Sequence, residues 1–436
     1  MRVLSRELKD HIDGKVTISG WLHKKRKLGG LNFINVRDRS GLIQVLIEDK
    51  DEVEKLRGLQ IGTVLSVEGS VIADERAPGG SEIHEPTLTI IESVTDEPPI
   101  EIDKPLDHKP ENQDTLFEHR TVGLRNIQEA DIFRIQATLT RAIRNYFDKN
   151  EFTEIHTPKL LAEATEGGAE VFKLDYFGKE ATLAQSPQFY KQMMVGVFER
   201  VYEIAPVYRA EPSATTRHMT EYTSVDGEMG FITLADLEDF LSGLLHVVVD
   251  EVWDKHEDAL KRRNQTKPEI AEKIPVIPMS EIHEKYSKAT GENTIGEKDL
   301  RPDEERWICD YAKKNLGSEA VFVSEWPASE MKFYHKANAE NSEIADRIDL
   351  LFRGVEITTG SMRENNYATV VGQLKDLAGG NPDDAGYAAF LSAMKYGMPP
   401  HGGFGLGLER LTQKLVGLNS VKEATLFPRD LNRLSP

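Results

Sequence analysis

The chain has 436 residues, of which 39% are hydrophobic and 29% are charged, a composition typical of a globular protein with two or three domains. Its formal net charge of −19 argues against a surface coated with nucleic acid. The single cysteine excludes an internal disulfide and favours a reducing, cytoplasmic location. The N-terminus lacks the apolar stretch of a signal peptide, and no apolar run approaches the roughly 20 residues that span a membrane.

Residues 15–95 consist of short apolar or alternating runs separated by glycine-rich turns, such as "KVTISGWLH" and "GTVLSVEGSVI". About five such strands within about 80 residues predict a small β-barrel. OB-folds have this size and bind oligonucleotides on one face. We therefore assign residues 1–97 to an OB-fold domain that binds nucleic acid.

Four consecutive cations, residues 24–27 in "HKKRKLGG", lie near the start of this barrel. Such a basic turn indicates local docking of a polyanion, although it also fits a solvated hairpin. Phe33 and Gln44 fall on neighbouring strands beside the turn. An aromatic ring can stack on a base and an amide can read its edge; Phe33 taken alone also fits a core position.

Residues 98–130 begin with a proline-rich segment, which forbids a continuous helix there and indicates a hinge or linker. The remainder, residues 131–436, mixes strands and helices and predicts an antiparallel α+β domain. One long helix is expected to start behind Thr233, where Asp236 completes a capping box. The polar stretch 256–320, with a helix near 303–314, is interpreted as an insertion.

The segment "SPQFYKQMM" predicts another helix, with Ser186 as N-cap and Pro187 in the first helical position. Gln188 and Lys191 are three residues apart, so they share one face. A helix start also favours nearby anions. The alternative is an ordinary capped surface helix.

The segment "DLLFRGVEITTGSMREN" carries two carboxylates, Asp349 and Glu356, which are candidate Mg²⁺ ligands. Residues seven apart on one strand point to opposite faces, so a bulge near Gly354 is required to bring them together. Arg363 is expected after a turn at Gly360, where its planar fork suits a carboxylate.

The segment "GMPPHGGFGLGLER" is rich in glycine, but its spacing and the prolines before it exclude a Rossmann nucleotide motif. Glycines 402, 403, 405 and 407 instead clear space for a flat ring against the backbone. Arg410 then lies on the first turn of a helix and points toward that ring or its phosphates. A glycine-rich packing contact is the alternative.

Together these pieces resemble the class II aminoacyl-tRNA synthetases. The segments "FTEIHTPKL", "VYRAE" followed by "TTRHMTEY", and "GFGLGLER" are similar to motifs 1, 2 and 3 of that class, in the same order. The segments "TEGGAEVF", "QSPQFYK" and "LFPRDLNRLSP" resemble the aspartyl branch in its short, archaeal-type form. The resemblance covers nearly the whole chain and is weakest at about 256–345, which we treat as a family-variable insertion.

The resemblance implies an enzyme that activates L-aspartate with ATP and Mg²⁺ and transfers it to the 3′ end of tRNA-Asp. It also implies a homodimer with motif 1 at the interface. Whether tRNA-Asn is charged as well stays open, although His23 is compatible with the discriminating form. An asparaginyl enzyme is a second reading, for which Lys191 and Arg363 are the wrong chemistry. A nucleic-acid-binding protein with an inactive synthetase domain is a third.

The resemblance also assigns roles to individual residues of this chain. The catalytic residues are Arg209, Glu356 and Arg410. The ATP site comprises Arg209, Glu211, Arg217, His218, Glu356, Gly407 and Arg410. The aspartate site comprises Glu166, Gln188, Lys191, Arg209, Asp226, Thr359 and Arg363. The metal ligands are Asp349, Glu356 and Thr359, and the anticodon contacts are Arg26, Phe33 and Gln44.

Two departures from the family pattern concern these sites. Ser361 and Met362 in "GSMREN" replace the usual glycine and glutamine before the arginine, which puts the floor of the amino-acid pocket in question. Lys27 in "RKLGG" replaces an acid and adds positive charge near the expected anticodon site.

Overall fold

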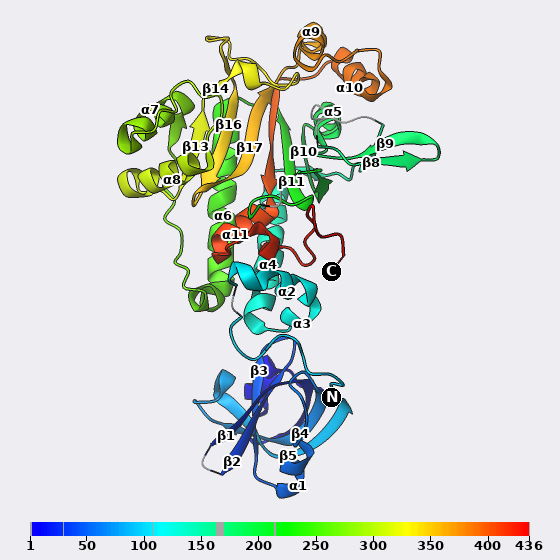
Figure 1. Cartoon of the computed structure of the whole chain (residues 1–436), viewed down its shortest axis with the longest axis vertical. Helices are drawn as coiled ribbons and strands as arrows, with labels where there is room; N and C mark the ends of the chain where they lie inside the picture. Colours follow the sequence, from blue (N-terminus) through cyan, green and yellow to red (C-terminus); the bar gives the residue numbers. More distant parts are fainter. Residues whose placement is uncertain (1, 29, 107, 163–169, 213–214, 436) are drawn as a thin grey trace. The chain divides into compact units, whose positions relative to one another are not determined.

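The computed structural model (Figure 1) describes residues 2–28, 30–106, 108–162, 170–212 and 215–435. These residues divide into two compact units, Met1–Ala130 and Asp131–Pro436. None of the helices in the described part of the chain is both long and apolar enough to cross a membrane.

The first unit is built on a closed five-stranded barrel with the strand order β1-β2-β3-β5-β4. The strands are β1 (Lys15–Leu28), β2 (Leu31–Arg37), β3 (Leu42–Ile47), β4 (Val64–Ala73) and β5 (Ser81–Glu92). Valine, isoleucine and leucine side chains from all five strands fill one buried core. The alternating pattern therefore placed the barrel correctly.

Several short helices of the first unit were not predicted. They are η1 (Ser5–His11), α1 (Lys50–Lys55), η2 (Pro78–Gly80), η3 (Pro110–Asn112), α2 (Gln113–Glu118) and α3 (Arg120–Gly123). The Asp49 side chain starts α1 by accepting hydrogen bonds from two backbone N–H groups. Residues 98–130, interpreted as a hinge, lie within this compact unit and bury Ile100 and Ile102.

The second unit is built on an eight-stranded sheet with the order β12-β13-β16-β17-β18-β11-β10-β6. Its strands are β6 (Thr153–Glu154), β10 (Arg200–Tyr208), β11 (Glu221–Gly230), β12 (Val276–Pro278), β13 (Ala320–Ser324), β16 (Arg347–Phe352), β17 (Val355–Arg363) and β18 (His401–Gly407). Neighbouring strands are antiparallel except the two edge pairs, β12 with β13 and β10 with β6. The expected antiparallel α+β architecture is confirmed.

Helices α4 (Ile127–Lys149), α6 (Leu234–Arg262) and α11 (Leu408–Val416) pack with this sheet in the largest hydrophobic core. The long helix α6 begins where the sequence predicted. The hydroxyl group of Thr233 accepts a hydrogen bond from the backbone N–H of Asp236, whose carboxylate in turn accepts one from the Thr233 N–H.

The stretch 256–345, interpreted as an insertion, contributes to the main fold: α6 continues to Arg262, and β12 and β13 belong to the main sheet. Every residue of β13 from Ala320 to Val323 is buried. Between these strands lie α7 (Met279–Thr290) and α8 (Pro302–Leu316), the latter matching the helix predicted near 303–314. The rest of the stretch forms η4 (Ala328–Glu330) and the short pair β14 (Trp326–Pro327) and β15 (Ile344–Ala345).

A smaller group of elements flanks the sheet beside β10 and β11 (Figure 1). It consists of β7 (Leu160–Leu161), β8 (Lys173–Tyr176), β9 (Lys179–Leu183), α5 (Gln188–Phe198), α9 (Tyr367–Ala378) and α10 (Ala385–Lys395), and the chain ends after η5 (Val421–Ala424). Helix α5 starts one residue later than predicted, because Pro187 has a non-helical ψ of 26° and acts as the N-cap. The Ser186 hydroxyl still accepts a hydrogen bond from the Gln188 N–H, at 3.2 Å.

Candidate active site

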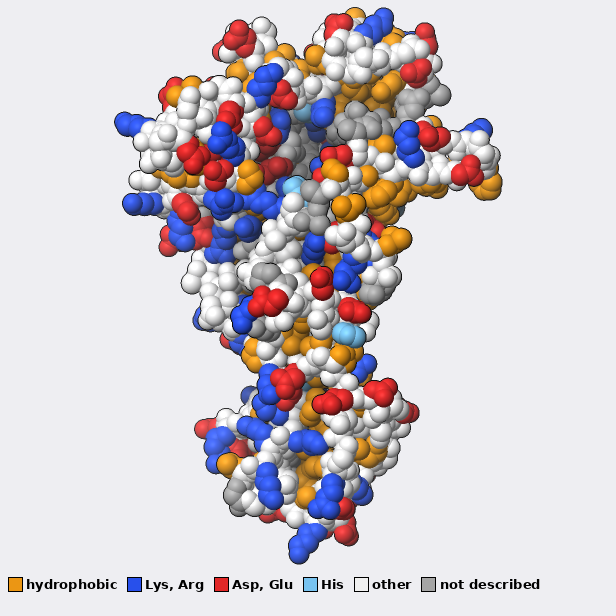
Figure 2. Space-filling view, in the orientation of Figure 1, with side chains coloured by type: hydrophobic (Ala, Val, Ile, Leu, Met, Phe, Trp, Pro, Cys, Tyr) orange, Lys and Arg blue, Asp and Glu red, His pale blue; other side chains and the backbone are white. Residues whose placement is uncertain are grey.

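One pocket of about 360 Å³ gathers most of the residues that the sequence had singled out in the second unit. Figure 2 shows charged side chains around a hollow on this unit. The predicted residues that line it are Gln188, Lys191, Arg209, Glu211, Arg217, His218, Asp226, Glu356, Thr359, Arg363, Gly407 and Arg410. Glu166 falls outside the described residues. Arg209, Arg363 and Arg410, which come from three separate segments of the chain, therefore share one hollow.

The hairpin of β10 and β11 delivers the first of these arginines. Arg209 follows the last residue of β10, and its N–H donates to the Thr220 carbonyl at 2.9 Å, which closes the base of the connecting loop. The Arg209 guanidinium lies 5.8 Å from the Tyr222 ring centroid. Strand β10 thus ends in charged residues that it positions at the pocket.

Two further side chains of the loop, those of Arg217 and His218, also line the pocket. Arg217 donates from Nη1 to Glu305 Oε2 at 2.8 Å and from Nη2 to the Gly354 carbonyl at 3.2 Å. His218 shares a hydrogen bond with the Thr215 hydroxyl at 2.7 Å. Burial lowers the pKa of His218, so its ring loses its proton at a lower pH than an exposed histidine does.

At the floor of the pocket, two cations and two carboxylates form a buried network. Lys191 Nζ donates to Asp226 Oδ1 at 2.8 Å and to the Phe404 carbonyl at 2.9 Å. Arg363 donates from Nε and Nη2 to the two oxygens of Glu228, at 2.8 and 3.2 Å. None of these four side chains is more than 4% exposed. Their formal charges cancel, as burial of ions requires.

Glu228 is the member of this network that the sequence analysis missed. Asp226 and Glu228 are two apart on β11, so both point to the same face of the sheet. That alternation was the available signal. Burial alone would raise the pKa of Glu228. Arg363 and Lys191 nevertheless hold it below its usual value.

The unusual "GSMREN" segment has a clear place at this floor. The Ser361 hydroxyl accepts a hydrogen bond from Arg363 Nη1 at 2.6 Å, so the residue that replaces a glycine helps to orient the guanidinium. The Met362 sulfur lies 2.8 Å from the position that a Cβ atom on Gly402 would take, so it fills the space beside that glycine. Gly360 lies inside β17, so the turn predicted there was wrong.

The glycine-rich strand β18 serves two purposes rather than one. A Cβ atom at Gly403 would lie 1.9 Å from Glu228 Oε2, so this glycine, like Gly402, is required by packing. Gly405 and Gly407 line the pocket. Of the four glycines predicted to clear space for a ring, two therefore line the pocket and two are needed for packing.

The candidate metal ligands lie on the β16–β17 hairpin. Glu356 and Thr359 line the pocket, and the Thr359 hydroxyl donates to Glu356 Oε1 at 2.6 Å. Asp349 lies opposite Thr359 in the ladder and accepts hydrogen bonds from Arg347 on both carboxylate oxygens. Burial raises the pKa of Asp349 to about 7. Within the described part of the chain, no group of three or more His, Cys, Asp or Glu side chains has metal-binding geometry.

The bulge that the hairpin needed lies further along than expected. Arg353 and Gly354, with φ of 48° and 83°, form the turn itself. The ladder shifts register between Leu350 and Leu351. Leu350 pairs with Thr358, whereas Leu351 pairs with Glu356. Ile357 is therefore the extra residue, and the bulge brings Glu356 to the same face as Thr359 and its ladder partner Asp349.

Helix α11 contributes Arg410 and Glu409 from its first turn. Arg410 Nη1 donates to the Glu356 carbonyl at 3.0 Å and lies 3.6 Å from the Glu356 carboxylate. Both oxygens of Glu409 accept from the Thr223 N–H, at 3.0 Å. Burial raises the pKa of Glu409 to about 7.

The raised pKa of Glu409 makes stability depend on pH. Because the folded pKa exceeds the ordinary value of 4.5, this group contributes stability below about pH 4.5, and that contribution is lost as the pH rises toward 7. We expect the unfolding free energy, measured by urea denaturation, to fall less between pH 5 and 7.5 in Glu409→Gln than in the unaltered chain. Parallel profiles for the two proteins would contradict this assignment.

In the barrel of the first unit, the three residues predicted to contact a nucleic acid lie together. Arg26 pairs with Phe33 across the β1–β2 ladder. Arg26 Nη2 donates to Gln44 Oε1 at 2.9 Å, and Gln44 Nε2 donates to Glu82 Oε2 at 2.7 Å. Phe33 is half-buried. Glu82, which the sequence analysis missed, fixes the orientation of the Gln44 amide because an ionised carboxylate only accepts hydrogen bonds.

Comparison with known proteins matches both units. Residues 112–431 match the family described as tRNA synthetases class II (D, K and N), and residues 16–91 match the OB-fold nucleic acid binding domain. An aspartate–tRNA(Asp/Asn) ligase of Thermus thermophilus is 41% identical over all of both chains. An aspartate–tRNA(Asp) ligase of Pyrococcus abyssi is 38% identical over 99% of each. The asparaginyl-tRNA synthetase of Pyrococcus horikoshii with asparaginyl-adenylate superposes with a TM-score of 0.92, at 30% identity over all of both chains.

Proposed function

Since the chain belongs to the class II tRNA synthetases (D, K and N), we propose that it is an aspartate–tRNA ligase. It activates L-aspartate with ATP to aspartyl-adenylate and transfers the aspartyl group to the 3′ end of tRNA-Asp. The observation that carries this proposal is the pair of buried cations, Lys191 and Arg363, on the floor of the pocket.

Activation joins two anions, so the site must offset negative charge where it develops. An aspartate carboxylate oxygen attacks the α-phosphorus of ATP, a new P–O bond forms, and pyrophosphate leaves. Arg209 would contact both the carboxylate and the α-phosphate, and Glu211 would accept from the adenine amino group. Arg217, His218 and Arg410 would bind the outer phosphates. Positioning and electrostatics suffice without a covalent enzyme intermediate.

The choice of aspartate over asparagine follows from charge and hydrogen bonding at the pocket floor. A carboxylate accepts hydrogen bonds from Lys191 and Arg363, and bidentate binding to the guanidinium adds specificity. The asparagine amide would place donors against donors, which is costly in a buried site. Gln188 and Asp226, with Glu166, would surround the α-ammonium group.

The residues on the hairpin fit a Mg²⁺ ion, which prefers oxygen ligands and usually takes one or two carboxylates together with substrate phosphates. We propose Glu356 and Thr359 as its protein ligands, because both line the pocket. Asp349, which accepts a hydrogen bond from Arg347 on each oxygen, is the third proposed ligand, because each oxygen keeps a second lone pair. A bound ion would offset the negative charge of the phosphates.

Amino-acid-dependent ATP–pyrophosphate exchange tests the proposal. We expect aspartate to support exchange, with asparagine at least about 100-fold less effective in kcat/KM, because two buried cations face its neutral amide. An asparaginyl enzyme, suggested by the fold similarity to the Pyrococcus horikoshii structure, predicts the reverse. An inactive binding protein predicts no exchange with either amino acid.

Whether the enzyme charges one tRNA or two is a separate question. Relatives named for tRNA(Asp/Asn) and for tRNA(Asp) are 41% and 38% identical to this chain, a small difference. Because the 41% identical relative is named for both tRNAs, we propose that tRNA-Asp is a substrate and that tRNA-Asn is an additional one. Aspartylation of each purified tRNA resolves the question, and a product with tRNA-Asp alone would refute the second part.

The barrel should recognise the anticodon without taking part in activation. We expect Phe33→Ala to raise the KM for tRNA about 10-fold or more, because base stacking contributes roughly 1–3 kcal/mol, and to leave ATP–pyrophosphate exchange unchanged. Ile72→Ala, which shortens a partly exposed apolar side chain of β4, is the matched control. Loss of ATP–pyrophosphate exchange in Phe33→Ala, or an unchanged KM for tRNA, would contradict this division of labour.

We also propose that the enzyme is a cytoplasmic homodimer. Val197, Phe198 and Phe231 are 63%, 47% and 71% exposed. The segments that carry them are joined by a hydrogen bond from the Gly230 N–H to the Glu199 carbonyl, at 2.8 Å. Exposed apolar side chains that lie together favour a protein interface. Sedimentation analysis should give twice the chain mass; a monomer would refute the proposal.

A further inference from the structure

A carboxylate outside the recognised motifs contacts one of the phosphate-binding candidates. Glu305 lies on α8, in the stretch with the weakest family resemblance, and its Oε2 accepts from Arg217 Nη1 at 2.8 Å. The two side chains are only 15% and 22% exposed. Arg217 nevertheless lines the pocket. The contact thus links α8 to the site where ATP is expected.

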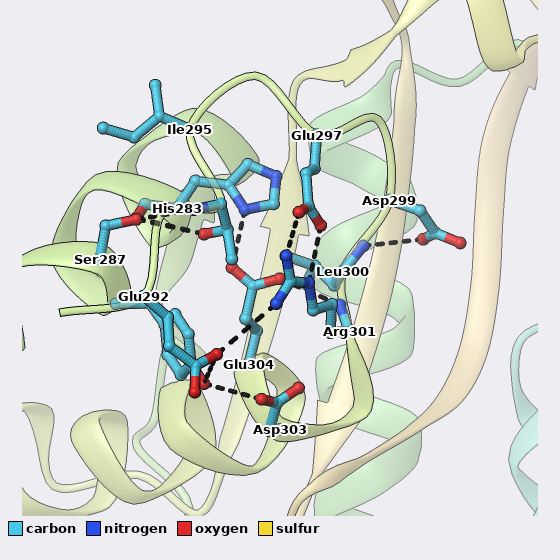
Figure 3. Close-up of polar contacts among 12 residues, drawn as sticks. His283, Ser287, Glu292, Ile295, Glu297, Asp299, Leu300, Arg301, Asp303 and Glu304 are labelled. Atoms are coloured by element: carbon cyan, nitrogen blue, oxygen red, sulfur yellow. Dashed lines mark hydrogen bonds and ion pairs between the residues drawn. The ribbon is translucent and has the colours of Figure 1, made fainter. Parts of the chain in front are cut away.

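The first turn of α8 is firmly attached to α7, as Figure 3 shows. Glu304 is fully buried; its Oε1 pairs with His283 Nδ1 at 2.8 Å and its Oε2 accepts from the Arg301 N–H at 3.0 Å. Asp303 accepts from the Tyr286 hydroxyl at 2.7 Å. These contacts fix the residues immediately before Glu305.

The other side of α8 lies against the β16–β17 turn. A Cβ atom on Gly354 would be 3.2 Å from Arg306 Cγ, so helix and turn are closely packed. The Gly354 carbonyl is the second acceptor for Arg217, at 3.2 Å. The Arg217 guanidinium is therefore held between two fixed acceptors before any substrate arrives.

We propose that Glu305 is a positioning residue that holds Arg217 ready for the outer phosphates of ATP. This inference rests on the proposed function. An arginine side chain loses much rotamer freedom when it is fixed. Because Glu305 and Gly354 restrict Arg217 in advance, less of that cost falls on nucleotide binding. The two acceptors engage two of the five guanidinium N–H groups, and the phosphates would engage others. The helical pair α7–α8 thereby supports catalysis although it contributes no motif residue.

The test uses the whole chain and measures ATP–pyrophosphate exchange with aspartate. We expect Glu305→Ala to raise the KM for ATP about 10-fold with kcat within about 2-fold, as loss of uniform binding requires. Glu305→Gln keeps an acceptor and should give a smaller rise. Glu297→Ala is the matched control: it removes an ion pair with Arg301 in the same helical pair, away from the pocket, and should leave both constants unchanged.

A double-mutant comparison separates positioning from a general structural effect. In an Arg217→Ala background, Glu305→Ala should have no further effect on the KM for ATP. An equal rise in that background, an unchanged KM in the single variant, or a lower KM because Glu305 competes with phosphate would each overturn the inference. Exchange by the unaltered chain tests the proposed function separately. Calorimetric titration with ATP alone tests Glu305 whatever the amino acid substrate is.

Discussion

Replacing Arg209 by alanine should reduce aspartate-dependent ATP–pyrophosphate exchange at least about 1,000-fold. A preorganised cation at the reacting phosphate stabilises charge that develops only in the transition state, and loss of such groups typically costs about 10²–10⁵-fold. The effect should fall on kcat more than on either KM. Arg209→Lys should recover part of the activity, because it keeps the charge but loses the planar fork.

Arg134→Ala provides the matched control for Arg209. Arg134 is 43% exposed, pairs with Asp131 at 3.0 Å on the same unit, and is outside the pocket lining. We expect full activity from this variant and unchanged thermal unfolding from both. If Arg209→Ala kept more than about a tenth of the activity, the role assigned to this arginine would be wrong.

The second large effect is expected at Arg363, where activity and stability should both fall. Arg363→Met would leave the fully buried Glu228 without its main partner, and breaking a buried ion pair typically costs about 3–5 kcal/mol. Aspartate activation should fall about 100-fold or more, because the receptor for the side-chain carboxylate is lost. Urea denaturation and exchange kinetics measure the two losses.

A double variant separates these two consequences. Adding Glu228→Gln to Arg363→Met removes the uncompensated charge, so it should restore much of the unfolding free energy. It should restore none of the aspartate activation. Recovery of activity together with stability would show that Arg363 acts only as a structural partner of Glu228 and does not select the substrate.

Local sequence patterns predicted much of this fold. Alternation placed the barrel strands, the Thr233–Asp236 capping box placed the start of α6, and spacing put Gln188 and Lys191 on one face of α5. These features depend on neighbours two to four residues away. The same reasoning said less about residues 256–345, because polar composition does not reveal that the buried β13 joins the main sheet.

The site was predicted through resemblance, and its internal contacts were not. Arg363 meets Glu228, and Arg217 meets Glu305, across 135 and 88 residues of chain. Such pairs depend on strand order and register. The register shift between Leu350 and Leu351 is an example, because the sequence required a bulge in this hairpin but did not place it correctly. Glu228 could have been predicted from a local pattern, because it lies two residues after Asp226 on the same strand.

A crystal structure with a non-hydrolysable aspartyl-adenylate analogue tests most directly whether the cations of this pocket bring aspartate and ATP together. We predict that Arg209 will contact the phosphate or its substitute, and that Lys191 and Arg363 will bind the aspartate carboxylate. An analogue bound elsewhere, or bound in the pocket with its side chain turned away from Lys191 and Arg363, would contradict the account.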